Sequence, residues 1–109
     1  MTSDKTPSGT DIADVPMMQV THDHLLNEAV KITQPSDGYR VGSDAVLLAA
    51  SVGTITGRVL DMGAGVGGVC LCLARRLAEL QITAVEKNAD MAALCSENAV
   101  QNGLQNRIR

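Results

Sequence analysis

A run of glycines at residues 63–68 follows a short apolar segment and is preceded by one carboxylate, Asp61. A glycine-rich turn between a strand and a helix lets a ligand approach the backbone, because no Cβ stands in the way. The glycines satisfy two patterns at once. Gly63, Gly65 and Gly68 fit G-x-G-x-x-G, the fingerprint of dinucleotide-binding folds. Asp61, Gly63, Gly65 and Gly67 fit D-x-G-x-G-x-G. The glycines alone therefore leave the ligand open.

Two carboxylates narrow the chemistry of that ligand. A dinucleotide fold usually has an inward-facing apolar residue at the position of Asp61, and burying a carboxylate there would be costly. An acid suits a ligand with ammonium and sulfonium cations, whereas a pyrophosphate favours a helix dipole with no acid nearby. Glu86 comes 23 residues after Gly63, where an acid can accept hydrogen bonds from a ribose diol in either class of cofactor. The alternatives without a ligand are a loop cap at Asp61 and a charged strand end at Glu86.

The elements around the glycines alternate between strand and helix patterns. We expect strands at residues 58–62 and 82–86, helices at 69–80 and from Asn88 or Asp90 to a C-cap at Gly103, and the approach to a third strand at 104–109. This β-α-β-α order predicts a parallel sheet with crossover helices, which is an α/β fold.

A hairpin and a further helix are expected before the first of these strands. Residues 29–41 are a candidate β-hairpin, with the turn at Pro35–Gly38. Ser43 or Asp44 can cap a helix at residues 45–50, which is apolar nearly all round and is therefore expected to be buried. Residues 1–19 are polar and aperiodic, so they are expected to be a disordered tail, with residues 20–109 as the folded part.

Composition excludes several classes of function. The 109 residues are 45% apolar and include a single aromatic side chain, Tyr39, so a nucleic-acid site built on stacked rings is poorly supported. A net charge of −3 argues against a self-sufficient electrostatic nucleic-acid binder. No apolar run approaches the roughly 20 residues that a membrane span needs, and the N-terminus lacks a secretory h-region. Three cysteines cannot all pair within one chain, which favours a reducing, cytoplasmic setting.

No metal site is predicted. The His22–His24 segment has no further ligand cluster near it in the sequence, and a solvated helix start is the preferred interpretation. Cys70 and Cys72 lie two apart on the expected helix, about 200° apart around its axis, so they cannot chelate one ion. Cys72 falls on the polar side of that helix and is expected to be partly exposed. Arg75 and Arg76 are expected to form a solvated face.

Several segments occur in an order that resembles a known family. They are residues 34–35, 38–40, 42–50, 59–67, 85–86 and 98–103. Together they resemble the N-terminal half of the methyltransferase small domain group, and above all the bacterial valine-tRNA adenine-N6 methyltransferases, over about residues 22–109. The glycine loop marks only the superfamily of S-adenosylmethionine-dependent methyltransferases, whereas the stretch from Gly38 to Leu48 is more specific.

The resemblance implies a truncated doubly wound, Rossmann-like class I methyltransferase fold, preceded by a β-hairpin and a buried helix. It implies S-adenosylmethionine as the cofactor and tRNA as the substrate of the full-length family. The methionine end of the cofactor would be lined by Asp61, Gly63, Ala64, Gly65 and Gly67. Glu86 would hold the ribose, Lys87 would flank the adenosine, and residues 39–40 and 43–44 would form an N-terminal lid over the pocket.

The sequence also departs from the family. The family's catalytic signature is Asn-Pro-Pro-Tyr after the fourth strand, in which the Asn and a prolyl carbonyl accept the hydrogens of the target amine and the Tyr stacks on a flipped base. This sequence contains no such motif, and it lacks the acid after the third strand that contacts the adenine amine. We therefore expect half of a cofactor site, no catalytic residue, and a chain that is inactive by itself.

Two other interpretations stay open at this point. The first is a non-catalytic remnant or interaction module, because a sheet of two or three strands leaves an unpaired edge that invites dimerisation or pairing with a missing C-terminal half. The second is a fragment of an NAD-type Rossmann fold, supported by the spacing of Gly63, Gly65 and Gly68.

Overall fold

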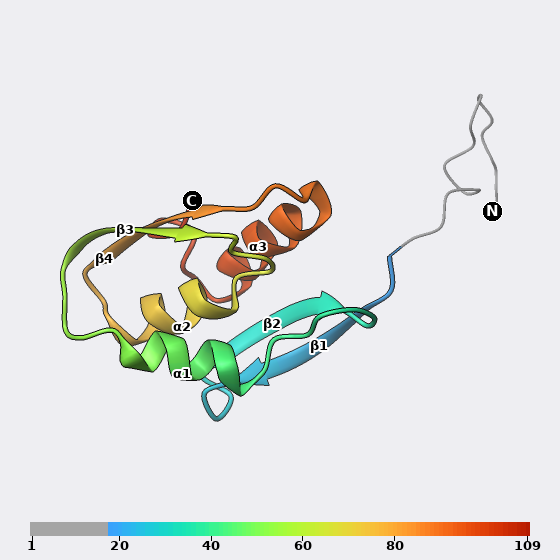
Figure 1. Cartoon of the computed structure of the whole chain (residues 1–109), viewed down its shortest axis with the longest axis horizontal. Helices are drawn as coiled ribbons and strands as arrows, with labels where there is room; N and C mark the ends of the chain where they lie inside the picture. The colour runs from blue at the N-terminus through green and yellow to red at the C-terminus, as the bar shows by residue number, and fades with distance from the viewer. Residues whose placement is uncertain (1–17) are drawn as a thin grey trace.

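The computed structural model describes residues 18–109 (Figure 1). Its elements in chain order are β1 (Val20–Leu25), β2 (Val30–Pro35), α1 (Ser43–Ser51), β3 (Gly57–Met62), α2 (Gly68–Arg76), β4 (Leu80–Val85) and α3 (Ala89–Gln101). The tail expected at residues 1–19 lies outside the described residues except for Met18 and Gln19.

The second half of the chain forms the predicted α/β unit. β3 and β4 pair in parallel, with Asp61 opposite Ala84, and α2 connects them. After α3 the chain returns to the other edge of β4, where Ile108 bridges to Ile82 in parallel and the N–H of Arg109 donates to the Ile82 carbonyl at 3.0 Å. The β-α-β-α order and the approach to a third strand are therefore confirmed.

The hairpin is present, but the prediction of its position is wrong. β1 and β2 pair antiparallel along their whole length, which places the His22–His24 segment in a strand and not at a helix start. The chain reverses at residues 26–29, where three residues other than glycine have positive φ: Leu26, Asn27 and Glu28. The Pro35–Gly38 turn signal instead marks the exit from β2. Left-handed backbone at such residues leaves almost no trace in a sequence.

Helix α1 is less buried than predicted. Only Ala45 and Ala49 are buried, whereas the side chains of Leu47 and Leu48 are 67% and 58% exposed. The helix packs on α2 through one narrow face of small residues, so its apolar composition did not decide its burial. Its N-cap residue is Gly42, without a side-chain hydrogen bond, and the predicted Ser or Asp cap is absent.

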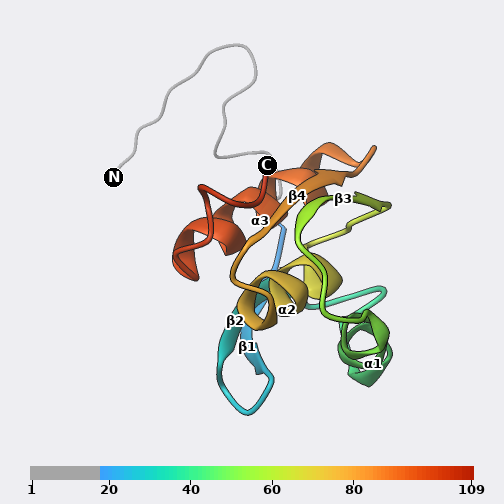
Figure 2. The same cartoon turned by 90° about the vertical axis from the view of Figure 1, so that its left-hand side faces the viewer.

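Helix α2 lies in the middle of the molecule, between the β3–β4 sheet and the layer formed by α1 and the hairpin (Figures 1 and 2). It ends at Arg76, four residues earlier than predicted, because Leu80 already begins β4. This central position buries both faces of the helix. Cys72 is only 2% exposed, so the expectation that it faces solvent is wrong.

The arginine pair at the end of α2 serves neighbouring helix ends. Arg76 donates to the carbonyls of Ala49 and Val52 at the end of α1, and Arg75 donates to the Asn102 carbonyl after α3 at 2.9 Å. The last carbonyls of a helix lack partners within the helix, and cationic donors there satisfy them. Both arginines are exposed, as predicted, and they also cap these helix ends.

The start and end of α3 match their prediction. The Asn88 side chain caps the helix by accepting hydrogen bonds from the N–H groups of Asp90 and Met91 at 3.0 and 3.1 Å. Gly103 follows the helix with a φ of +70°, the left-handed conformation that a C-terminal glycine supplies.

One face of the β3–β4 sheet carries apolar side chains that no element of residues 18–109 covers. Leu60, Met62 and Val85 are 59%, 70% and 41% exposed. The outer edge of β3 has no partner strand within the described residues. Parallel sheets are normally covered on both faces, so this face and edge mark an incomplete sheet.

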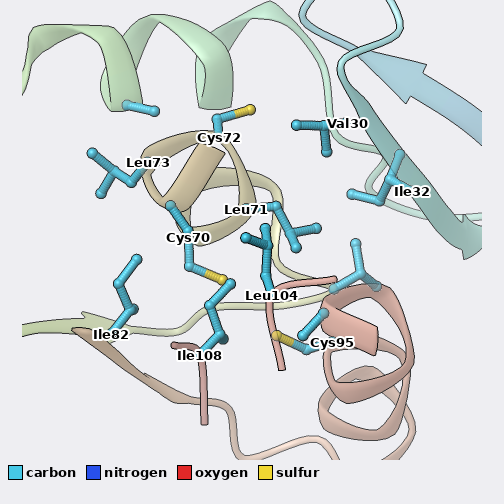
Figure 3. Close-up of a cluster of buried hydrophobic side chains, with 14 of the residues drawn as sticks. Val30, Ile32, Cys70, Leu71, Cys72, Leu73, Ile82, Cys95, Leu104 and Ile108 are labelled. Atoms are coloured by element: carbon cyan, nitrogen blue, oxygen red, sulfur yellow. The ribbon is translucent and has the colours of Figure 1, made fainter. Parts of the chain in front are cut away.

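The hydrophobic core is aliphatic and centres on Leu71 of α2 (Figure 3). Leu71 is fully buried, and the surrounding cluster draws on β2, β4, α3 and the C-terminal segment through Val30, Ile32, Leu80, Ile82, Leu94, Ala99, Leu104 and Ile108. Packing without aromatic rings is what the composition required.

Replacing Leu71 by Ala should lower the free energy of unfolding by about 2–5 kcal/mol, because it opens a cavity in the centre of this cluster. Urea denaturation followed by circular dichroism measures the change. The control is Val100→Ala on α3, whose side chain is 60% exposed and which should change stability by less than about 0.5 kcal/mol. Equal effects of the two substitutions would contradict the assignment of the core.

Candidate functional site

A cavity of about 750 Å³ lies between the glycine loop (residues 63–68) and the linker (residues 36–42) that joins β2 to α1. The glycine loop forms one wall through Gly63, Ala64, Gly65, Val66 and Gly68. The linker forms the opposite wall through Ser36, Asp37, Gly38, Tyr39 and Val41. Residues from the ends of neighbouring elements complete the lining: Met18, Gln19, Pro35, Ala45, Val69, Asn88 and Met91.

The loop backbone leaves open space on the cavity side. Gly63 and Gly65 have φ of +74° and +59°, and a Cβ added at either position would meet no atom within 4 Å. Gly68 is different, because its Cβ would lie 2.7 Å from a methyl of Val41. The third glycine of the G-x-G-x-x-G pattern is thus required by close packing of α2 against the linker.

Three successive backbone amides of the glycine loop are already used within the chain. Gly63 and Ala64 both donate to the carbonyl of Val85, at 2.8 and 2.9 Å, and Gly65 donates to the Glu86 carboxylate at 2.8 Å. Binding of a phosphate group depends on unpaired N–H groups that point at the anion. This part of the loop therefore favours van der Waals contact with a ligand over hydrogen bonds to a phosphate group.

Asp61 lies at the end of β3, beneath the glycine loop, and does not itself line the cavity. Its Oδ2 atom is buried and has no hydrogen-bond partner among the described residues. Burial raises the pKa of the Asp61 carboxyl above its ordinary value of 3.8. A buried carboxylate oxygen without a donor is costly, so Asp61 is suited to a cationic group that the chain does not supply.

Glu86 is held in place by two backbone amides. Its Oε2 accepts from the Asn88 N–H at 2.9 Å and its Oε1 from the Gly65 N–H at 2.8 Å. These bonds, with the nearby positive charge of Lys87, lower the pKa of Glu86. Each carboxylate oxygen keeps a second lone pair, so a fixed Glu86 can still accept hydrogen bonds from a diol.

The linker is tied back to the hairpin by polar contacts. Arg40 forms an ion pair with Asp23 at 3.0 Å and donates to the Pro35 carbonyl at 2.8 Å. Gln34, which is only 3% exposed, accepts from the Val41 N–H at 2.8 Å and donates to Asp23 at 3.0 Å. Hydrogen bonds from Gln34, Thr21 and Arg40 lower the pKa of Asp23.

Tyr39 projects from this wall with 72% of its side chain exposed. Its hydroxyl donates to Asp44 at 2.6 Å, which raises the pKa of the Tyr39 phenol and lowers that of the Asp44 carboxyl. Of the residues predicted to form a lid, 39–40 and 43–44, Tyr39 therefore lines the cavity and the other three lie outside its lining.

Three of the seven predicted site residues line the cavity and four do not. Gly63, Ala64 and Gly65 line the cavity, while Gly67 is buried at the start of α2. The remaining three lie beside the cavity and outside its lining: Asp61, Glu86 and Lys87, the last of them exposed.

Sequence reasoning missed the role of Asn98 in supporting this site. Its side chain is fully buried and bonds to both β2 and the glycine loop. The available signal was a polar residue on the buried face of α3, at the position where Leu94, Cys95 and Ala99 predict an apolar neighbour.

Residues 18–109 contain no group of three or more His, Cys, Asp or Glu side chains placed to hold a metal ion. None of the helices in this part of the chain is long and apolar enough to cross a membrane.

Comparison with known proteins assigns the same region. The methyltransferase small domain family matches residues 37–109. The tRNA1(Val) (adenine(37)-N6)-methyltransferase of Erwinia tasmaniensis is 41% identical over 71 residues, which are 63% of this chain and 29% of that protein. The protein of the same name from a Flavobacteriaceae bacterium is 33% identical over 79 residues, 72% of this chain and 34% of its own length. The chain thus spans about a third of the length of these relatives.

The fold is found among solved structures as well. TYW2 from P. horikoshii, in a crystal structure with MeSAdo, superposes with a TM-score of 0.68 at 23% identity. The match covers 86% of this chain and 36% of that one. At this identity the likeness shows the fold, which is the predicted Rossmann-like α/β arrangement.

The pKa values of the two acids of the site should be shifted in opposite directions from their ordinary values. We expect the carboxyl of Asp61 to titrate above 3.8, because it is desolvated, and that of Glu86 below 4.5, because amide donors stabilise its charge. Carbon-13 NMR of the carboxyl groups measures both values. An Asp61 value below 3.8 would show that a donor satisfies Oδ2.

The directions of these two pKa shifts also determine how the free energy of unfolding depends on pH. The raised pKa of Asp61 means that its contribution to stability is present at low pH and is lost as the pH rises through the folded-state value. Glu86 behaves oppositely, because its contribution is present above 4.5 and is lost as the pH falls through its lowered pKa.

Proposed function

The chain belongs to the methyltransferase small domain family, and from this premise we propose that it is the S-adenosylmethionine-binding part of a methyltransferase that acts on the N6 atom of adenine in tRNA. The reaction class follows from the family, and the cofactor is S-adenosylmethionine. The substrate is proposed from the printed names of the relatives, of whose length this chain spans about a third.

The observation that carries the proposal is the unpartnered Oδ2 of Asp61 beneath an open glycine cradle. S-adenosylmethionine carries an ammonium and a sulfonium cation, and either would be a positively charged partner for this buried carboxylate. The amides of residues 63–65 are already bonded, which disfavours a pyrophosphate at the same place. The residues present therefore fit this cofactor better than a dinucleotide.

We assign the predicted residues accordingly. Gly63, Ala64 and Gly65 contact the methionine part from the cavity wall, with Gly67 fixing the turn into α2. Glu86 accepts hydrogen bonds from the ribose hydroxyls through its free lone pairs, and its orientation is fixed before the cofactor arrives. Lys87 flanks the adenosine. We assign residues 20–109 to the N-terminal half of the domain, and Met18 and Gln19, which precede it, to the lining of the cavity.

The cofactor supplies a methyl group that is already activated, so the protein contributes position more than acid–base chemistry. A group that orients the target amine is then essential. The sequence has no Asn-Pro-Pro-Tyr run, so we expect this chain by itself to transfer little or no methyl group. A tritium-transfer assay on unmodified valine tRNA measures this, and clear methylation by these 109 residues would contradict it.

Calorimetry with S-adenosylmethionine and NAD in parallel tests the cofactor. The chain should bind the first and not the second, and Asp61→Asn should weaken binding about tenfold or more, because it removes a buried charge opposite the cation. The same substitution should raise the stability of the free chain, since a neutral amide is cheaper to bury.

The matched control is Glu97→Gln, a charge removal at an exposed position of α3 outside the cavity lining. It should leave the affinity unchanged within about threefold. Binding of NAD alone would overturn the assignment and favour the dinucleotide interpretation of Gly63, Gly65 and Gly68.

A pairing role is the second candidate function, and the uncovered face of β3–β4 favours it. Leu60 and Met62 are exposed beside an unpaired strand edge, which is a template for association with another chain. Sedimentation velocity should then show association that rises with concentration and is reduced by Leu60→Glu. A monodisperse monomer that melts cooperatively would contradict this candidate.

A further inference from the structure

The buried amide of Asn98 links the glycine loop, which is one wall of the cavity, to β2, the strand that leads into the linker wall. Its Nδ2 donates to the carbonyl of Val66 in the glycine loop at 2.9 Å and to that of Thr33 in β2 at 3.0 Å. Its Oδ1 accepts from the Thr33 N–H at 2.8 Å and from the Gln101 side chain at 2.7 Å. With two carbonyls on one side and an N–H on the other, the orientation of the amide is fixed by its partners.

Asn102 makes a related contact one helical turn later. Its Oδ1 accepts from the Lys31 N–H at 2.8 Å and its Nδ2 donates to the Lys31 carbonyl at 2.7 Å. Four residues of helix rise about 6 Å and two residues of strand extend about 6.7 Å. Two asparagines on one face of α3 can therefore pair with alternate residues of β2, as a neighbouring strand would.

The two asparagines differ in one respect that matters for the cavity. The Asn98 side chain donates a hydrogen bond to the glycine loop as well as to β2. The second hydrogen bond donated by the Asn102 side chain goes instead to the backbone carbonyl of Asn98, at the end of the same helix. Thr33 comes two residues before Pro35, where the cavity lining begins on the linker side, and Val66 lies in the opposite wall. Asn98 is thus a hydrogen-bonded link between the glycine loop and the strand that leads into the linker, in addition to the packing of Val41 against Gly68.

We propose, on the basis of the function proposed above, that Asn98 is a positioning residue for S-adenosylmethionine. It holds the linker and the glycine loop at the separation that the cofactor requires, although it touches neither the cavity nor the ligand. Its full burial and complete set of hydrogen bonds make that separation rigid, because a displaced partner would leave a buried polar group unpaired.

The test compares two identical substitutions, Asn98→Asp and Asn102→Asp. Each removes the donors of one amide and keeps its acceptors, and both should lower the stability of the hairpin docking. Asn98→Asp should weaken binding of S-adenosylmethionine about tenfold or more, whereas Asn102→Asp should change it by less than about threefold. Wild-type affinity in a folded Asn98→Asp variant, or an equal loss in both variants, would overturn the proposal.

A measurement on the wild-type chain covers the case in which Asn98→Asp does not fold. Titration with S-adenosylmethionine should shift the side-chain amide signals of Asn98 in nitrogen-15 NMR and slow the exchange of the Thr33 amide. Neither residue lines the cavity, so these changes report coupling between the walls. Unchanged signals at saturation would overturn the proposal.

The proposed function can fail independently of this inference. If the wild-type chain does not bind S-adenosylmethionine, the proposed function is contradicted. Hydrogen exchange in the free chain then tests whether Asn98 holds the glycine loop in place. Faster exchange at the amides of Gly67 and Gly68 in Asn98→Asp, but not in Asn102→Asp, supports the positioning role. The same exchange in both variants overturns it.

Discussion

The outer edge of β2 must find hydrogen-bond partners, and the rest of the fold is arranged around how it does so. The hairpin has only two strands, so the backbone groups of Lys31 and Thr33 face away from β1 toward α3. Lys31 is exposed but Thr33 is buried, and unpaired backbone groups at Thr33 would be costly in a marginally stable domain. Asn98 and Asn102 satisfy the backbone groups of both residues, and in doing so they place the hairpin, α3 and the glycine loop in one rigid arrangement.

A second constraint concerns the hydrogen bonding of the glycine loop and of Asp61 at the end of β3. The loop amides bond to Val85 and Glu86, while Asp61 keeps a buried oxygen without a donor. The three successive amides of residues 63–65 are thus satisfied, while one carboxylate oxygen beside them is not. A binding site that is costly to the free protein and is completed by its ligand is a common arrangement, because the unpaired group gains most when the ligand arrives.

The differences between expectation and structure concern the hairpin, α1 and the surroundings of α2, and they share a cause. The hairpin turns at Leu26–Glu28, where tertiary packing imposes left-handed backbone on residues that do not favour it. Helix α1 is apolar, but within residues 18–109 its main packing partner is α2, and Cys72 is buried because α2 lies between two layers. Arg76 finds its carbonyl partners on a helix about 25 residues earlier in the chain. Local patterns carry no information about such neighbours.

The sequence by itself determined the parallel α/β order, the aliphatic core, the glycine loop with Asp61 and Glu86, and the ends of α3. These follow from periodicity, glycine positions and caps, which act over a few residues. Only the tertiary structure decided which amides of the loop are already used, that Gly68 is needed for packing on Val41, and that Asn98 links the glycine loop to β2. Those facts depend on contacts between residues 20 to 65 positions apart, whose geometry exists only after the chain has folded.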